Sequence, residues 1–186
     1  MPRGAAPPVH IVAADVAPSA LALARRNDAE CRAKCTIRED QHAVHLDVCE
    51  ADMMSDKSID ELVHTAGGPF DVLVCNPPYI PWADWTSLDE SVRAWEDPGA
   101  LVGFPRPGDR KDGLAYYRRL AHLIATGALL SPSPLHAQQH VPNMAVEVGF
   151  GQAEQVVRIV RHTNMFSHVT TWHDQYGVER AVLAWL

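Results

Sequence analysis

The chain has 186 residues, of which 47% are hydrophobic and 21% charged, values typical of one globular domain with a sizeable core. Its formal net charge of −7 argues against a large nucleic-acid interface, which needs a basic face. No charge-free apolar run is long enough to span a membrane. These properties exclude a membrane protein and favour a small molecule or a protein as the partner.

The cysteines and histidines show no spacing typical of a disulfide framework or a metal site. Cys31 and Cys35 lie close together without a matching second pair, and the ten histidines are scattered along the chain. We therefore predict reduced thiols and no metal-binding residues.

The first third of the chain alternates predicted strands and helices, as in an α/β fold. Strands are expected over 9–14 and 43–49, helices over 18–27 and 59–64, and a loop over 31–42. Asp15 follows the first strand. Its carboxylate could cap the next helix, or it could accept hydrogen bonds from ribose hydroxyls in a nucleotide-binding fold.

Residues 71–81 are the most informative stretch. Apolar residues 72–75 predict a buried strand, and the sequence Asn76-Pro77-Pro78-Tyr79 ends it, because proline lacks an N–H and fixes its φ angle. The result is a rigid corner, rich in hydrogen-bond acceptors, at the carboxyl end of a strand. Open α/β sheets bind their ligands at that edge.

This corner suits methyl transfer to a planar nitrogen. The side-chain oxygen of Asn76 and the carbonyl of Pro77 could accept both N–H groups of an amide or exocyclic amine, while Tyr79 forms a flat wall. Such contacts position the nitrogen and strengthen as positive charge develops on it. The alternative is a turn without chemistry, since Asn and Pro are common turn residues.

The remainder is predicted to contain a long irregular segment, two helices and three strands. In order these are the irregular segment 82–110, helix 114–126, a surface insertion over 131–140, strand 144–148, helix 152–161, and strands 169–172 and 181–185. Trp82, Trp85 and Trp95 could line a substrate groove or anchor the irregular segment by packing, and we favour packing.

Four further blocks follow Asn76-Pro77-Pro78-Tyr79 in order: SVRAWEDPGAL at 91–101, DGLAYYR at 112–118, EVGFGQA at 147–153 and GVERAV at 177–182. Together they resemble the HemK/PrmC family, class I methyltransferases that modify N5 of a glutamine in peptide chain release factors. The resemblance runs from about Val9 to the C-terminus. It implies a Rossmann-like α/β sheet, S-adenosyl-L-methionine (SAM) as cofactor, and the Gly-Gly-Gln loop of a release factor as substrate.

The resemblance also implies site residues. Those expected to hold the substrate amide are Asn76, Pro77, Pro78 and Tyr79. Those expected to bind the cofactor are Asp15 at the ribose, Asp52 and Met53 at the adenine, and Asn76. The residues alone leave another interpretation open for two of them, in which Asp52 caps a turn and Met53 fills the core.

The chain departs from the family before residue 9. A class I methyltransferase opens with an acidic strand and a Gly-rich turn that approaches the cofactor, and neither occurs here; nor does the family's N-terminal helical domain. We expect an N-terminally truncated homologue, with one incomplete catalytic domain over 1–186 that lacks the first strand and the Gly-rich loop. The strand would lie between those predicted at 9–14 and 72–75, whose edges would be unpaired.

Two other functions stay open. The same corner could hold an adenine amine, as in an adenine-N6 methyltransferase acting on nucleic acid, although the negative charge counts against it. A non-catalytic homologue or partner subunit is the third possibility, favoured by the missing Gly-rich turn. The expected compartment is mitochondrial or cytoplasmic, with no targeting segment in this chain.

Overall fold

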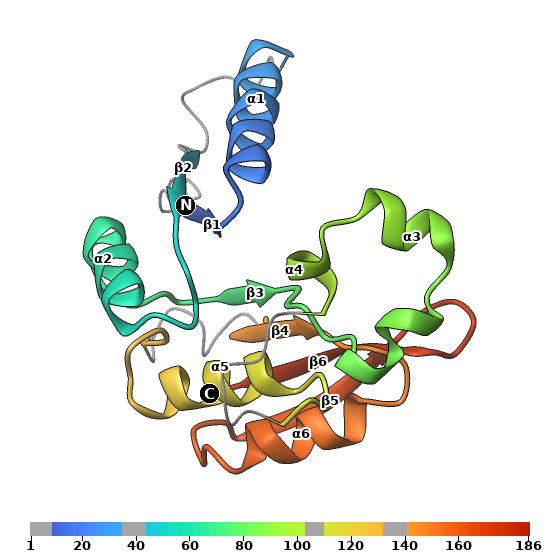
Figure 1. The fold of residues 1–186 in the computed structure, drawn as a ribbon. Coiled ribbons are helices and arrows are strands. Elements are labelled where there is room, and N and C mark those ends of the chain that lie inside the picture. Colours follow the sequence, from blue (N-terminus) through green and yellow to red (C-terminus); the bar gives the residue numbers. More distant parts are fainter. Residues whose placement is uncertain (1–8, 35–43, 103–109, 132–140) are drawn as a thin grey trace. The chain divides into compact units, whose positions relative to one another are not determined.

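The computed structural model describes residues 9–34, 44–102, 110–131 and 141–186. The chain divides into two compact units, Met1–Gly68 (unit 1) and Pro69–Leu186 (unit 2), each of which contains helices and a sheet. The fold is mixed α/β, as predicted (Figure 1).

Unit 1 is a β-α-β arrangement followed by a second helix. It consists of β1 (Val9–Asp15), α1 (Pro18–Lys34), β2 (Val44–Glu50) and α2 (Asp56–Ala66). β1 and β2 pair in parallel, with Val9 opposite Val44 and Asp15 opposite Glu50 (Figure 1). Parallel strands need a long crossover, and α1 provides it while burying Leu21.

Helix α1 is longer than the sequence predicted. Residues 31–34, assigned to a loop because of their polarity, belong to its last turns. There Arg32 pairs with Asp28 and Lys34 with Glu30, both at i,i+4 spacing, which supports helical turns that bury no apolar side chain. The rest of the predicted loop, 35–42, lies outside the described residues.

Unit 2 is built on a four-stranded sheet with the order β3-β4-β6-β5 (Figure 1). The strands are β3 (Leu73–Cys75), β4 (Met144–Glu147), β5 (His168–His173) and β6 (Glu179–Trp185). β3 runs parallel to β4, whereas β6 runs antiparallel to both β4 and β5. The two central strands, β4 and β6, supply the most buried side chains of the sheet.

Two amphipathic helices cover this sheet. α5 (Ala115–Ala125) and α6 (Ala153–Arg161) pack against each other, and α6 also packs on β5 and β6 (Figure 1). Their buried side chains recur at helical spacing: Tyr117, Leu120 and Ile124 in α5, and Ala153, Val156 and Val160 in α6.

The segment after β3 is more regular than predicted. It contains a 3₁₀ helix, η1 (Trp82–Ser87), and the short helices α3 (Glu90–Trp95) and α4 (Pro98–Leu101). Aspartates begin both α-helices: Asp89 accepts from Ser91 N–H and Asp97 from Gly99 N–H. Sequence periodicity missed helices this short.

The three tryptophans of this segment differ in burial. Trp95 is 89% exposed, so the packing interpretation is wrong for this residue. Trp82 is also exposed, whereas Trp85 is half-buried.

β1 and β3 are both edge strands of their sheets. Within the described part of the chain, β1 pairs with β2 alone and β3 with β4 alone. Residues 132–140 of the predicted surface insertion lie outside the described ranges. None of the helices in those ranges has the length and apolar character of a membrane span.

Candidate active site

The corner after β3 forms as the sequence indicates, but the prediction that the strand before it is buried is wrong, because Val74 in the middle of β3 is 79% exposed. β3 ends at Cys75, and Asn76-Pro77-Pro78-Tyr79 continues without helix or strand geometry. Pro77 is buried and Tyr79 half-buried, while Asn76 is exposed. The corner is therefore anchored in unit 2 but presents the Asn76 side chain to its surroundings.

Gln152 fastens this corner to the loop after β4. Its amide nitrogen donates to the Tyr79 carbonyl at 2.9 Å, and its amide oxygen accepts from the Gly149 N–H at 3.1 Å. Gln152 is only 8% exposed, so both bonds satisfy a buried amide that would otherwise be costly. One side chain thus ties the backbone of the corner to the backbone of the loop after β4.

Two glycines allow the surrounding loops to approach. A Cβ at Gly113 would lie 2.2 Å from the Tyr79 carbonyl oxygen, and φ there is +74°, which favours glycine. A Cβ at Gly149 would lie 2.6 Å from the Gln152 amide oxygen and 2.9 Å from the Tyr79 ring. Any larger residue at either position would displace the corner.

Asp112 and Arg118 stabilise the Gly113 loop. Arg118, in α5, donates from both terminal nitrogens to the Asp112 carboxylate, at 3.1 and 2.5 Å. The same carboxylate accepts from the Leu114 N–H at the start of the helix. The Arg118 hydrogen bond lowers the pKa of Asp112 below its usual range, which keeps the carboxylate charged.

Glu147, at the end of β4, lies beside two tyrosines. The Tyr79 hydroxyl donates to its carboxylate over a long 3.5 Å, and the Tyr117 hydroxyl donates to its carbonyl at 2.9 Å. Burial, followed by the Glu147 charge and hydrogen bond, raises the pKa of Tyr79. Burial also raises the pKa of Tyr117, and that of the Cys75 thiol to about 11. These three groups are therefore neutral at physiological pH.

Two hydrogen-bond acceptors of the corner have no partner in the described part of the chain. Among the described residues, no hydrogen bond engages the side chain of Asn76 or the carbonyl of Pro77. Both lie at the carboxyl end of an edge strand. An amide –NH2 has two donors, so this pair of acceptors matches it chemically.

Unit 1 holds the other candidate residues at the carboxyl ends of its parallel strands. Asp15 Oδ1 accepts from the Ala17 N–H at 2.8 Å, and the Asp15 carbonyl accepts from the Ala51 N–H at 3.0 Å. Asp52 Oδ1 accepts from the Met54 N–H, also at 2.8 Å. Both aspartates therefore form the turns that the sequence allowed, and both are exposed.

Met53 is half-buried, so it is not simply a core residue. The structure groups Asp15, Asp52 and Met53 within unit 1, and Asn76, Pro77, Pro78 and Tyr79 within unit 2.

Sequence reasoning missed the residues that support the corner. Gly113, Glu147, Gly149 and Gln152 all fall inside blocks that carry the family resemblance, so those blocks were the available signal. It also missed a cluster of His10, His45 and Asp47 on β1 and β2.

Comparison with known proteins identifies relatives for most of the chain. No protein-family model matches it. The release factor glutamine methyltransferase of Chlorobaculum tepidum is 39% identical over 126 residues, which cover 67% of this chain and 35% of the relative. The protein of the same name from Bacillus cereus is 36% identical over 121 residues, covering 65% of this chain and 37% of the relative.

A third relative aligns over nearly the whole chain. The release factor glutamine methyltransferase of Geobacter sulfurreducens is 30% identical over 176 residues, which cover 95% of this chain and 49% of the relative. The chain thus spans between about a third and a half of the length of these curated relatives. These matches confirm the resemblance drawn from the sequence blocks, and the chain belongs to the HemK/PrmC family of release factor glutamine methyltransferases.

Proposed function

We propose that this chain carries the substrate-binding corner of an enzyme that methylates the side-chain amide nitrogen of a glutamine in a peptide chain release factor. The observation that carries the proposal is the pair of open acceptors, the Asn76 side chain and the Pro77 carbonyl, on a corner fastened by Gln152. The names of the relatives supply the substrate class.

The corner acts by positioning. The Asn76 side-chain oxygen and the Pro77 carbonyl accept the two amide N–H groups, which holds the nitrogen with one face toward the methyl donor. Both hydrogen bonds strengthen as the nitrogen becomes positive, so they stabilise the transition state more than the bound substrate. The proton leaves to water after transfer.

Tyr79 forms the wall against which the planar amide packs. Its backbone is held by Gln152, and its ring lies close to Gly149. The raised pKa of Tyr79 keeps the hydroxyl uncharged, so the wall adds no competing negative charge beside the amide.

The acids of unit 1 fit the nucleoside part of SAM. Asp15 and Asp52 follow adjacent parallel strands, where carboxylate oxygens can accept from ribose hydroxyls and the adenine amine. Asp15 would hold the ribose, Asp52 and Met53 would lie at the adenine, and Asn76 would also face the cofactor. SAM supplies a methyl group on positively charged sulfur.

The proposed fold is one Rossmann-like methyltransferase domain that includes residues 1–186. In this fold the unpaired edges of β1 and β3 would each pair with a strand that carries a Gly-rich turn. That turn would complete the cofactor site, so residues 1–186 alone should bind SAM weakly. Release factors act in the cytoplasm and in mitochondria, which are therefore the proposed compartments.

The test compares residues 1–186 with a chimera in which residues 9–186 follow the N-terminal part of the Geobacter sulfurreducens relative. Calorimetric titration should detect SAM binding by the chimera and little by the short chain. The chimera should also methylate a release factor at the glutamine of its Gly-Gly-Gln loop, read out by mass spectrometry. Tight binding by the short chain would contradict the proposed sheet.

Asn76→Ala in the chimera tests the corner itself. Turnover should fall about 100-fold or more, because a transition-state hydrogen bond is lost, while SAM affinity changes far less. Asn27→Ala, on an exposed face of α1, is the matched control and should retain activity. Unchanged turnover in Asn76→Ala would refute the assigned role. Methylation of DNA or RNA adenine, with none of the release factor, would refute the substrate.

A further inference from the structure

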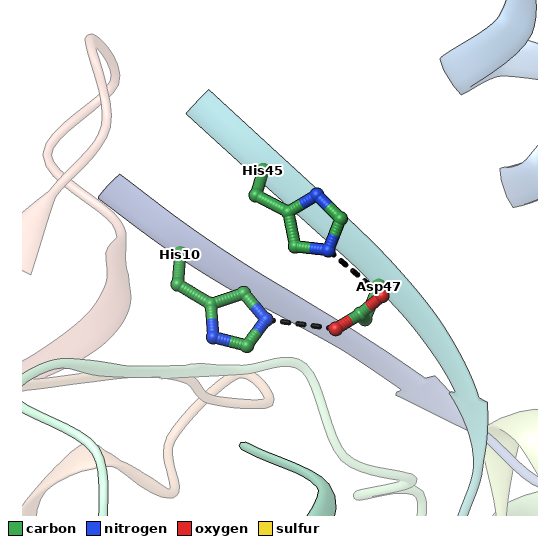
Figure 2. Close-up of side chains that lie close together, drawn as sticks. All are labelled: His10, His45 and Asp47. Atoms are coloured by element: carbon green, nitrogen blue, oxygen red, sulfur yellow. Dashed lines mark hydrogen bonds and ion pairs between the residues drawn. The ribbon is translucent and has the colours of Figure 1, made fainter. Parts of the chain in front are cut away.

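Three potential metal ligands meet on one face of the unit 1 sheet. The parallel register of β1 and β2 sets His10 opposite His45, and Asp47 follows His45 by two residues. Because side chains alternate along a strand, all three project to the same side. Figure 2 shows both imidazoles turned toward the Asp47 carboxylate.

The distances are short. His10 Nε2 lies 2.8 Å from Asp47 Oδ2, and His45 Nε2 lies 3.2 Å from Asp47 Oδ1 (Figure 2). One ligand atom from each residue lies within 4.8 Å of the other two. In a tetrahedral zinc site, with bonds of about 2.0–2.1 Å, donor atoms are about 3.3 Å apart. Small side-chain rotations would therefore suffice to enclose an ion.

We propose that His10, His45 and Asp47 form a binding site for one Zn²⁺ ion. Two imidazole nitrogens and one carboxylate oxygen are ligands that Zn²⁺ accepts, and three protein ligands leave a position for water. All three side chains are partly exposed, so both the ion and the water have access.

The ligand atoms can take the required protonation states. His10 and His45 both present Nε2, and a neutral imidazole binds metal through that nitrogen when its proton is on Nδ1. The ion would replace the His10–Asp47 hydrogen bond and the His45–Asp47 ion pair.

Such an ion would act as a clip between the two strands. β1 and β2 form a two-stranded sheet, and two-stranded sheets are marginally stable alone. Ligands from both strands would convert binding free energy into stability of unit 1. The site uses residues of unit 1 alone, and the proposal does not depend on methyl transfer.

Zinc titration of the metal-free full chain by calorimetry tests this site. We expect one ion per chain at neutral pH, with a dissociation constant of about 1 µM or tighter. His10→Gln, His45→Gln and Asp47→Asn should each weaken binding at least about tenfold. His64→Gln, an exposed histidine in α2, is the matched control and should bind as the parent chain does.

Cys49 needs its own control, since it follows Asp47 by two residues on the same strand. Cys49→Ser should retain zinc binding, and the Co²⁺-loaded chain should lack a thiolate charge-transfer band. Circular dichroism without metal shows which variants fold. If a histidine variant does not fold, Asp47→Asn still tests the site. The proposal would be refuted if the folded ligand variants bound zinc as tightly as the parent chain, or if the parent chain bound none. The cluster would then be only a surface ion pair.

Discussion

The sheets of the two units differ in how completely they are buried. In unit 2, Met144 is 0% exposed and belongs to β4, which lies between β3 and β6. In unit 1, Ile11 of β1 is 46% exposed although it lies mid-strand and is apolar. The proposed substrate corner follows β3, whose Val74 is 79% exposed, but Gln152 ties it to the buried part of unit 2. The proposed cofactor acids follow the strands of a sheet with little core of its own.

This difference fits the proposal that unit 2 positions the substrate amide and that unit 1 binds the nucleoside part of the cofactor. A corner that positions an amide must be rigid, and Gln152, Gly113 and Gly149 hold it against a packed sheet. A strand whose apolar residues are half-exposed is not fully stabilised within unit 1, and this fits the proposal that it gains a neighbour in the complete enzyme.

The largest expected effect is the difference in unfolding free energy between truncating a buried side chain in unit 2 and truncating a half-exposed one in unit 1. Met144→Ala should lower the free energy of unfolding of unit 2 by about 2–5 kcal/mol, because a cavity remains in a fully buried site. Ile11→Ala should cost about 1 kcal/mol in unit 1, since roughly half of that side chain is already in water.

Two spectroscopic signals can measure these effects. All five tryptophans lie in unit 2, so their fluorescence during denaturation follows that unit, while circular dichroism includes unit 1. Equal losses for Met144→Ala and Ile11→Ala would show that the two sheets are not differently packed.

A second prediction addresses the close approach at the corner. Gly113→Ala should destabilise unit 2 by about 3 kcal/mol, through backbone strain and a clash with the Tyr79 carbonyl. Gly177→Ala is a matched control, because its φ of +77° is similar but no atom lies within 4 Å of the new methyl. Gly177→Ala should lower the free energy of unfolding only by the backbone strain of alanine at positive φ, about 1 kcal/mol. Denaturation followed by tryptophan fluorescence compares them, and equal costs would mean that the corner is not tightly held.

The sequence predicted those elements that a local pattern of residues determines. The apolar run before two prolines located β3 and the corner, and helical spacing located α5 and α6. It did not predict the last turns of α1, because ion pairs rather than apolar residues support them. It also missed α3 and α4, which are shorter than two full periods of the helical pattern.

Contacts between distant residues were beyond sequence reasoning. The Gln152 bond to Tyr79 joins residues on different loops, and the meeting of His10 with His45 depends on strand register. Register is set by how the whole sheet packs, so neither contact leaves a local pattern. Gln152 lies inside a block of family resemblance, but that block predicted neither its role nor its contact with Tyr79.

The smallest expected effect concerns pH and the Gly113 loop. The pKa of Asp112 is lowered in the folded state by Arg118, so this carboxylate binds protons less readily than in the unfolded chain. Its contribution is fully present above the unfolded pKa of about 3.9 and is lost as pH falls through the lower folded pKa. The Asp112 side chain is 35% exposed, so screening limits the contribution to less than about 1 kcal/mol.

Asp112→Asn should therefore reduce the stability of unit 2 slightly at neutral pH and have little effect in strong acid. Urea denaturation followed by tryptophan fluorescence at several pH values measures this difference. Asp71→Asn is the control, because Asp71 is exposed and has no ion pair among the described residues of unit 2. If the gap between Asp112→Asn and the parent chain persisted in strong acid, the substitution would act through the Leu114 hydrogen bond rather than through charge.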